Sequence, residues 1–199
     1  MAGTDQRDNG LGQAQTSAEE RLAGEFYDLE FSVQKSRRYH EKLCAFYGVW
    51  RDWVKIVSVI VGSGVFILVA AEIKHWAELF AALVAMWAIL DFMFSPDKRA
   101  EAHRALGERF TELAQKIHRS TRNEQTLGEL VACRLEIEKA EPPCKRLVDL
   151  QARNEECRSR GFPSASMVPL NTWQRVFGYF ATFGMGRLER WKDAQHRQV

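Results

Sequence analysis

Two apolar stretches separated by only four residues limit most strongly what this chain can fold into. The first stretch runs from Trp53 to Ala71 and the second from Trp76 to Phe94, and each has 19 residues. A helix rises about 1.5 Å per residue and needs about 20 mostly apolar residues to cross a bilayer. Both stretches are just long enough, so the pattern predicts a helical hairpin that spans a membrane.

A hairpin buried in a soluble helical protein is the alternative, because a chain of 199 residues can hold a large core. Both stretches, however, are apolar on all faces, as lipid-facing helices are. The flanking segments carry many charges and offer few apolar faces to cover such a hairpin. The membrane hairpin is therefore the preferred interpretation.

The distribution of positive charge predicts the orientation of this hairpin. Lys and Arg gather on both flanks, whereas Lys74 is the only such residue in the connecting loop. The positive-inside rule then places both termini in the cytoplasm. The net charge of +2 does not indicate direct binding of nucleic acid. The four cysteines match no CxxC or zinc pattern, so we expect reduced thiols in the cytoplasm.

Charged side chains lie near the ends of the two stretches. Folding the hairpin about Ile73 places Lys55 and Asp91 at similar depth, where one could neutralise the other within a protomer or between neighbours. The alternative is that each reaches the aqueous interface separately. Glu78 lies close to the outer boundary, where reaching the interface explains it adequately. If the helices line a channel, Glu78 would contribute to an acidic mouth that favours cations.

Small residues form one side of the first stretch. Ser58 and Gly62 are four residues apart, and Ser63 and Gly64 follow. Small residues at this spacing let helices approach closely in lipid, so we expect helix packing within the hairpin or between protomers. A water-facing channel lining is the second interpretation of the same residues.

The remaining sequence predicts an all-α protein: a two-helix transmembrane hairpin with a long N-terminal helix and a cytoplasmic C-terminal helical bundle. After the hairpin, Ser95 is expected to cap a helix that begins at Pro96. The expected segments are a disordered tail (1–18), a cytoplasmic helix leading into the membrane (19–52), the hairpin (53–94), cytoplasmic helices (95–160), and a linker with an aromatic amphipathic C-terminal helix (161–199).

The C-terminal helix is expected to begin at Asn171 and to carry a row of aromatic side chains. Trp173, Phe177, Phe180 and Trp191 are the candidate anchors in the membrane interface, with basic residues on the opposite side. Docking of the same helix on the other cytoplasmic helices is the alternative.

Motifs for catalysis are absent from the sequence. We find no phosphate-binding loop, HExxH, GxSxG, kinase or dinucleotide-binding signature, and predict no catalytic, cofactor-binding or metal-binding residue and no enzyme activity. His40 and His103 flank the hairpin at comparable distances and could meet in the cytoplasmic bundle. A surface histidine on each helix is the simpler alternative.

A family resemblance is carried by two segments that flank the hairpin. The segments are Ser36–Leu43 before the first stretch, and Ser95–Leu106 followed by Phe110–Leu113 after the second. Together with the short hairpin and the helical tail, they make residues 25–160 similar to the SLATT family of two-helix membrane effector domains from bacterial conflict systems.

The resemblance implies an effector of antiphage defence in the bacterial inner membrane. Such a protein would form a homo-oligomer in membrane lipid, and would act with a sensor protein or a nucleotide second messenger. It would permeabilise the membrane and stop the infected cell. The alternatives are a non-conducting membrane anchor or scaffold that recruits cytoplasmic partners, a soluble helical interaction protein, and a membrane enzyme with an unfamiliar site.

Overall fold

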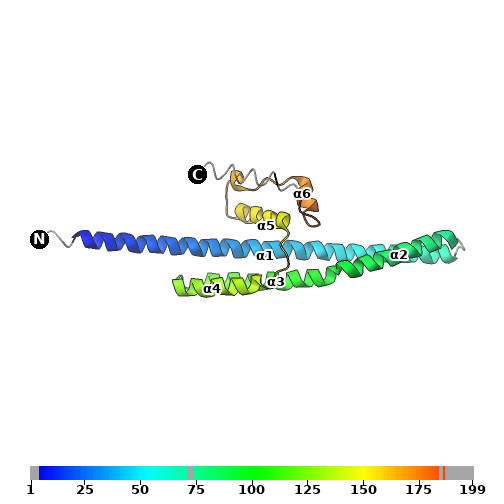
Figure 1. The fold of residues 1–199 in the computed structure, drawn as a ribbon, viewed down its shortest axis with the longest axis horizontal. Coiled ribbons are helices and arrows are strands. Elements are labelled where there is room, and N and C mark those ends of the chain that lie inside the picture. The colour runs from blue at the N-terminus through cyan, green and yellow to red at the C-terminus, as the bar shows by residue number, and fades with distance from the viewer. Residues whose placement is uncertain (1–4, 71–73, 184–185, 187–199) are drawn as a thin grey trace. The chain divides into compact units, whose positions relative to one another are not determined.

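Helices make up all the regular secondary structure in the described part of this computed structural model, which covers residues 5–70, 74–183 and 186 (Figure 1). No strand occurs there, so the prediction of an all-α protein is confirmed. The elements are α1 (Asp5–Ala70), α2 (Lys74–Phe94), α3 (Pro96–Arg119), α4 (Glu124–Glu138), α5 (Arg146–Ser159), the short 3-10 helix η1 (Ser164–Ser166) and α6 (Thr172–Phe177).

The chain divides into two compact units, and α1 contributes residues to both. One unit contains residues 1–39 and 106–199, and the other contains residues 40–105. We call the first the helical unit and the second the hairpin unit. In the described residues of the chain, no helix offers a segment with the length and apolarity needed to span a bilayer. Of the expected connecting residues 72–75, the first two lie outside the described residues, and Lys74 and His75 belong to α2.

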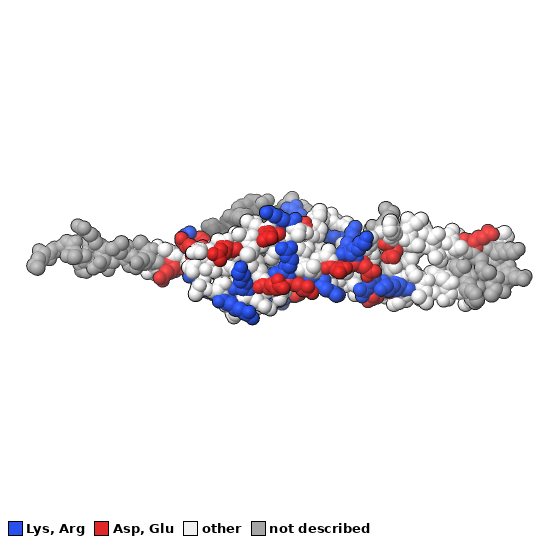
Figure 2. All heavy atoms as spheres, turned by 90° about the horizontal axis from the view of Figure 1, so that it is seen from below, with Lys and Arg blue, Asp and Glu red and all other residues white. Residues whose placement is uncertain are grey.

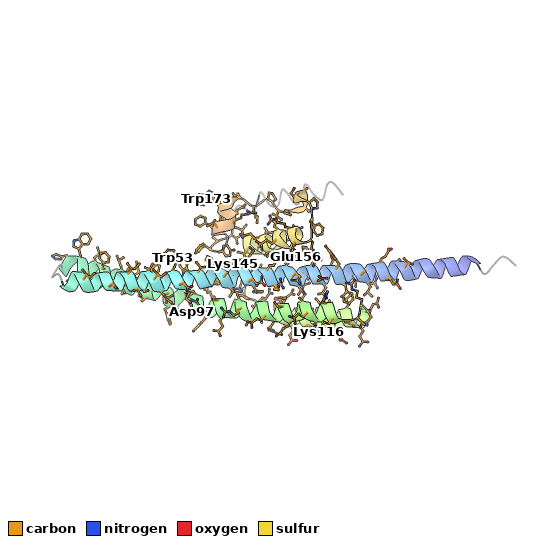
Figure 3. All side chains as sticks on the ribbon, turned by 180° about the vertical axis from the view of Figure 1, so that it is seen from behind. Trp53, Asp97, Lys116, Lys145, Glu156 and Trp173 are labelled. Atoms are coloured by element: carbon orange, nitrogen blue, oxygen red, sulfur yellow. The ribbon has the colours of Figure 1, made fainter. Side chains whose placement is uncertain are left out.

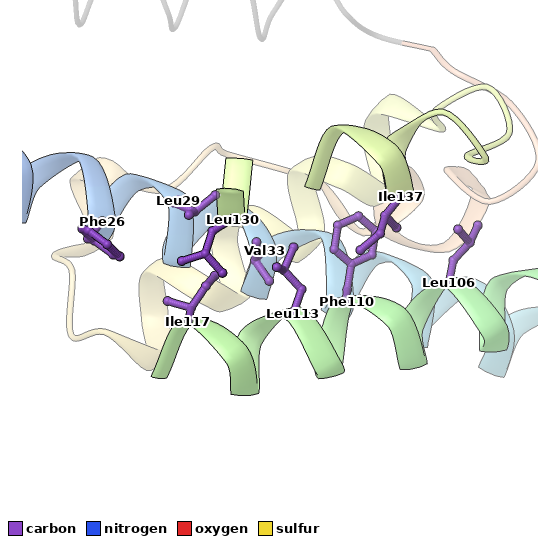
Figure 4. Packing of buried hydrophobic residues seen from close by; sticks show 9 residues of the cluster. All are labelled: Phe26, Leu29, Val33, Leu106, Phe110, Leu113, Ile117, Leu130 and Ile137. Atoms are coloured by element: carbon purple, nitrogen blue, oxygen red, sulfur yellow. The ribbon is translucent and has the colours of Figure 1, made fainter. Parts of the chain in front are cut away.

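The helical unit has an apolar core built by α1, α3 and α4 (Figure 4). Apolar residues three or four apart place their side chains on one face of each helix, and these faces meet. Burial of such side chains is the main favourable contribution to folding. The cluster consists of Phe26, Leu29, Val33, Leu106, Phe110, Leu113, Ile117, Leu130 and Ile137.

Helix α1 begins earlier than the sequence predicted. The expected disordered tail reached residue 18, whereas the helix begins at Asp5. Extending an existing helix adds one hydrogen bond per residue, and it avoids the costly first turn. The core residues from Phe26 onward hold the helix, so the polar segment before them can continue it.

The junction between α2 and α3 differs from the expected helix cap. Helix α3 begins at Pro96 as predicted. Ser95, however, has a positive φ of 40°, and its hydroxyl donates a hydrogen bond to the Phe92 carbonyl at 2.7 Å. The Ser95 hydroxyl therefore bonds a backbone carbonyl at the end of α2 and does not cap the first turn of α3. The backbone hydrogen bonds continue through this junction, because the Ser95 N–H donates to the Asp91 carbonyl at 2.9 Å and the Arg99 N–H donates to the Ser95 carbonyl at 3.2 Å.

Polar caps and charges shape the rest of the helical unit. Asn123 accepts a hydrogen bond from the Thr126 N–H at 2.7 Å and begins α4. Basic and acidic side chains are mixed on the face shown in Figure 2, which is typical of a solvated helix surface. A smaller apolar contact, formed by Leu147 and Val168, lies beside α5.

Helix α6 is shorter than the predicted C-terminal helix. Asn171 caps it through a capping box with Gln174, as its sequence position suggested. The helix ends at Phe177, and its C-cap residue Gly178 lies close to Leu147 of α5. Residues 184–185 and 187–199 lie outside the described residues, and with them the predicted anchor Trp191.

Candidate functional site

Large apolar side chains lie exposed on both helices of the hairpin unit. Their exposed fractions range from 43% at Leu83 to 83% at Phe92. The core residues of the helical unit, by contrast, are at most 7% exposed. The exposed set comprises Trp53, Ile56, Val59, Ile60 and Ile67 on α1, and Trp76, Leu79, Leu83, Met86, Ile89 and Phe92 on α2.

The charged residues that the sequence singled out are not brought into contact. Lys55 is exposed and Asp91 is half-buried, and within the described part of the hairpin unit no ion pair joins them. The nearest ion pair across the hairpin is further from the turn, where the Arg51 guanidinium lies 3.7 Å from the Asp97 carboxylate. Glu78 is exposed on α2.

The small residues of α1 form open surface within one chain. Ser58, Gly62 and Ser63 are exposed. A Cβ atom added at Gly62 would meet no described atom within 4 Å, and the same holds for Gly64. Packing inside the hairpin therefore does not require these glycines in the described structure. Contact with another molecule is the other packing role that the sequence suggested for them.

A buried histidine pair lies in the hairpin unit. The Nδ1 atoms of His40 on α1 and His103 on α3 are 2.9 Å apart, so one nitrogen donates the proton and the other accepts it. His40 is 0% and His103 is 5% exposed. Tyr47 stacks on His103 with ring centroids 5.7 Å apart, and Arg99 lies over the Tyr47 ring. The sequence suggested that these two histidines could lie together, and in the structure they do.

Helix α5 is attached to α1 by a buried carboxylate that sequence reasoning missed. Glu156, whose side chain is 4% exposed, accepts hydrogen bonds from Arg38 of α1 at 2.8 Å and from Arg160 at 2.6 Å (Figure 3). Arg160 also lies over the Tyr27 ring, 4.6 Å from its centroid. We call Arg38, Glu156 and Arg160 the carboxylate clamp. Only the spacing of Glu156 and Arg160 was visible in the sequence, as one of many helical charge pairs.

Further polar contacts extend this attachment along α1. Lys35 forms an ion pair with Asp149 at 2.9 Å, and the Lys145 N–H donates to the Tyr39 hydroxyl at 2.9 Å. Burial is the main cause that raises the pKa of Tyr39, so its hydroxyl stays protonated. The Lys145 ammonium donates to the Tyr179 carbonyl. Polar contacts therefore join α1 to α5 and to the residue before it, beside the buried apolar residues Val148 and Ala152 of α5.

Aromatic side chains gather on α6 and the turn after it. Trp173 is 66% exposed, and its ring stacks on Phe177 with centroids 5.2 Å apart. Phe180 is 55% exposed. Figure 3 shows Trp173 pointing away from α5. Three of the four predicted anchors therefore lie at the surface of the helical unit, and the fourth is outside the described residues.

The described residues contain no candidate metal site and no disulfide. Among the described residues, no group of three His, Cys, Asp or Glu side chains could hold a metal ion. The four cysteines are free thiols. No family model matches the chain, and no curated protein or solved structure shows significant similarity to it.

Proposed function

We propose that this protein is a membrane effector that inserts the hairpin unit into a bilayer, assembles with copies of itself and permeabilises the membrane. The observation that carries the proposal is the exposed apolar surface of α1 and α2, where Trp53, Ile60 and Phe92 are between 62% and 83% exposed. Contiguous apolar surface of this kind marks a membrane or protein contact in a folded protein.

The same surface argues against the soluble alternative. A hairpin buried in a soluble core would have its large apolar side chains covered by the rest of the chain. Ile56, Val59 and Leu79 remain 49% to 68% exposed. The aromatic residues Trp53 and Trp76 begin the two apolar stretches, as interfacial aromatics do. Lipid acyl chains are the surroundings in which these exposed apolar side chains would be favourable.

Assembly is required because two helices cannot enclose a water-filled path. The open small face at Ser58, Gly62 and Ser63 would let a second copy approach α1 closely in lipid. A trigger must bind the assembled and resting states with different affinity in order to shift their populations. The resemblance noted in the sequence suggests antiphage defence in a bacterial inner membrane, with a sensor protein or a nucleotide signal as the trigger.

Expression of the full chain in bacterial cells tests the proposal. We expect the protein in the membrane fraction, resistant to extraction by high salt and carbonate, and we expect loss of membrane potential in cells that express it. A protein that stays in the membrane while the potential remains normal through phage infection would instead be an anchor or scaffold. A protein released into the soluble fraction would overturn both interpretations.

Assembly is tested by adding bulk to the small face. Gly62→Leu places a branched side chain where the folded chain has open space, so the variant should insert normally but crosslink less between copies and leave the potential intact. Ile60→Phe adds bulk on the opposite side of α1 and is the matched control. Equal crosslinking and equal depolarisation in both variants would exclude the small face as the contact.

A further inference from the structure

The exposed aromatic side chains of α6 and the following turn lie on one face. Trp173, Val176, Phe177 and Phe180 follow the three- and four-residue spacing of a helix face, and they are 43% to 66% exposed. We call these four residues the aromatic face. An exposed apolar surface of this kind needs an occupant, and tryptophan and phenylalanine suit the region where lipid headgroups meet acyl chains.

The opposite side of α6 is held on α5, which fixes the direction of the aromatic face. Gln174 is 3% exposed, and its carbonyl oxygen and that of Arg175 accept hydrogen bonds from Gln151. Gly178 packs so closely that an added Cβ would lie 2.8 Å from the Leu147 Cβ. The aromatic face therefore points away from α5 and cannot turn inward without breaking these contacts.

The charge around the aromatic face indicates which occupant fits. Described residues 157–183, which contain the aromatic face, include three Arg and no Asp or Glu. Arg158 and Arg175, both exposed, line a small cavity at the edge of α6 with Glu155 as the only acid. An excess of positive charge in the segment that carries the exposed aromatic residues is complementary to an anionic lipid surface, and it would repel the same charge on a second copy.

We propose that the aromatic face inserts into the headgroup region of an anionic bilayer, as a second membrane contact separate from the hairpin. This inference rests on the proposed function in one respect: a chain already anchored by its hairpin needs only weak interfacial affinity, because the anchor raises the local concentration of lipid. The contact would hold the helical unit at the membrane surface.

Tryptophan quenching tests the inference on the full chain. The protein is reconstituted into vesicles of phosphatidylcholine with phosphatidylglycerol, and into vesicles of phosphatidylcholine alone, each with and without doxyl-labelled lipid. The emission of Trp173 is obtained by subtracting the emission spectrum of the Trp173→Phe variant from that of the unchanged chain. We expect this emission to shift to shorter wavelength and to be quenched by the doxyl group, more strongly in the anionic vesicles.

A second difference, taken with Trp53→Phe, reports separately on the hairpin. Quenching of the Trp53 emission without quenching of the Trp173 emission would overturn the inference and leave the membrane hairpin intact. Quenching of Trp173 alone would support the inference and contradict the hairpin. Absence of both would overturn both. A Trp173 shift that grows with protein density but resists the doxyl lipid would show a second copy as the occupant, and would also overturn the inference.

Val176→Asp supplies an independent variant. It places a negative charge in the middle of the aromatic face, so it should remove the quenching of Trp173 while helix content and the Trp53 signal stay unchanged. Ser164→Asp adds the same charge at an exposed position outside α6 and should behave as the unchanged chain. Equal quenching in both variants would contradict insertion of this face.

Discussion

Glu156 shows how one side chain can join distant parts of this sequence. Burial acts to raise the pKa of its carboxyl group, but the hydrogen bonds from Arg160 and Arg38 outweigh burial, so the net pKa is lowered. The carboxylate is thus charged and satisfied by two guanidinium groups. A buried charge is tolerated only with such partners. Removing one member of the group leaves a buried charge without its partner, which lowers the free energy of unfolding.

Glu156→Gln is expected to weaken the attachment of α5 to α1. The amide keeps the shape but loses the charge that both arginines need, which should cost about 2–3 kcal/mol. Faster hydrogen exchange in α5 would show this loss. Glu136→Gln removes the same charge from an exposed position on α4 and should leave α5 unchanged. Equal exchange in the two variants would show that the clamp contributes nothing.

The carboxylate clamp also predicts a dependence on pH. Because the folded-state pKa of Glu156 is lowered, its contribution is fully present above the ordinary carboxyl pKa. The contribution is lost as the pH falls through the lowered folded value. Protection of α5 amides should therefore fall in acid for the unchanged chain, and it should fall less in Glu156→Gln. Parallel pH profiles would contradict this assignment.

The histidine pair predicts a non-additive pair of substitutions. His40→Leu or His103→Leu alone leaves a buried ring nitrogen without its present partner, at a cost of about 1–3 kcal/mol. The double variant removes both polar groups and should cost less than the sum of the single variants. Thermal unfolding in detergent micelles measures all four chains. Strict additivity would show that the two rings do not depend on each other.

At the scale of elements, local signals agree with the structure where a boundary is set by neighbouring residues. Pro96 begins α3 and Asn171 caps α6, because each effect acts within one turn. The length of α6 was not predictable in this way. The C-cap residue Gly178 also lies close to Leu147, a contact across about thirty positions of the sequence that no local pattern reveals.

Gly178→Ala tests that contact. The added methyl group would lie 2.5 Å from the Gln174 carbonyl oxygen and 2.8 Å from the Leu147 Cβ, so α6 must shift away from α5, at a cost of about 1–3 kcal/mol. Gly128→Ala on α4 meets no described atom within 4 Å, and should stabilise its helix by roughly 1 kcal/mol. Proteolysis after residue 160 measures the release of α6, and equal rates would contradict the contact.

The sequence also indicated the helices more readily than the polar contacts between them. The periodicity of the apolar residues was enough to indicate the helices that build the core, and core residues such as Val33 and Phe110 fall on that spacing. The partners of Glu156 and His40 lie 118 and 63 positions away. The pairing of Glu156 depends on how α5 packs on α1, which no local pattern reveals, whereas the comparable distances of His40 and His103 from the hairpin suggested their contact. The matching depth of Lys55 and Asp91 suggested a pair within a protomer or between neighbours; no ion pair joins them in the described part of one chain, and pairing between copies stays a prediction.

At the scale of the whole molecule, the two units differ in what covers their apolar residues. The helical unit buries one cluster of them in a core and leaves the aromatic face exposed, whereas most of those on α1 and α2 of the hairpin unit are exposed. Under the proposed function, lipid would cover the exposed residues of the hairpin unit. The excess of basic residues on both flanks of the hairpin then predicts that both termini share one side of the membrane.

Cysteine labelling tests that topology. A membrane-impermeant maleimide added to intact spheroplasts should leave the unchanged chain unlabelled and should label His75→Cys, whose position is exposed next to the turn. Lysis of the spheroplasts should then allow labelling of the exposed Cys144. Labelling of Cys144 before lysis would place the C-terminal part outside and contradict the predicted orientation.

The carboxylate clamp has a consequence for how this protein can change over evolutionary time. Loss of Glu156 alone would remove the carboxylate that Arg38 and Arg160 share, and loss of either arginine would leave a buried anion with one of its two guanidinium partners. A substitution at one of these three positions is therefore tolerated only with substitutions at the other two, so we expect the three to change together. Relatives that diverged beyond recognition elsewhere should vary at these positions as a set, with apolar residues replacing all three at once.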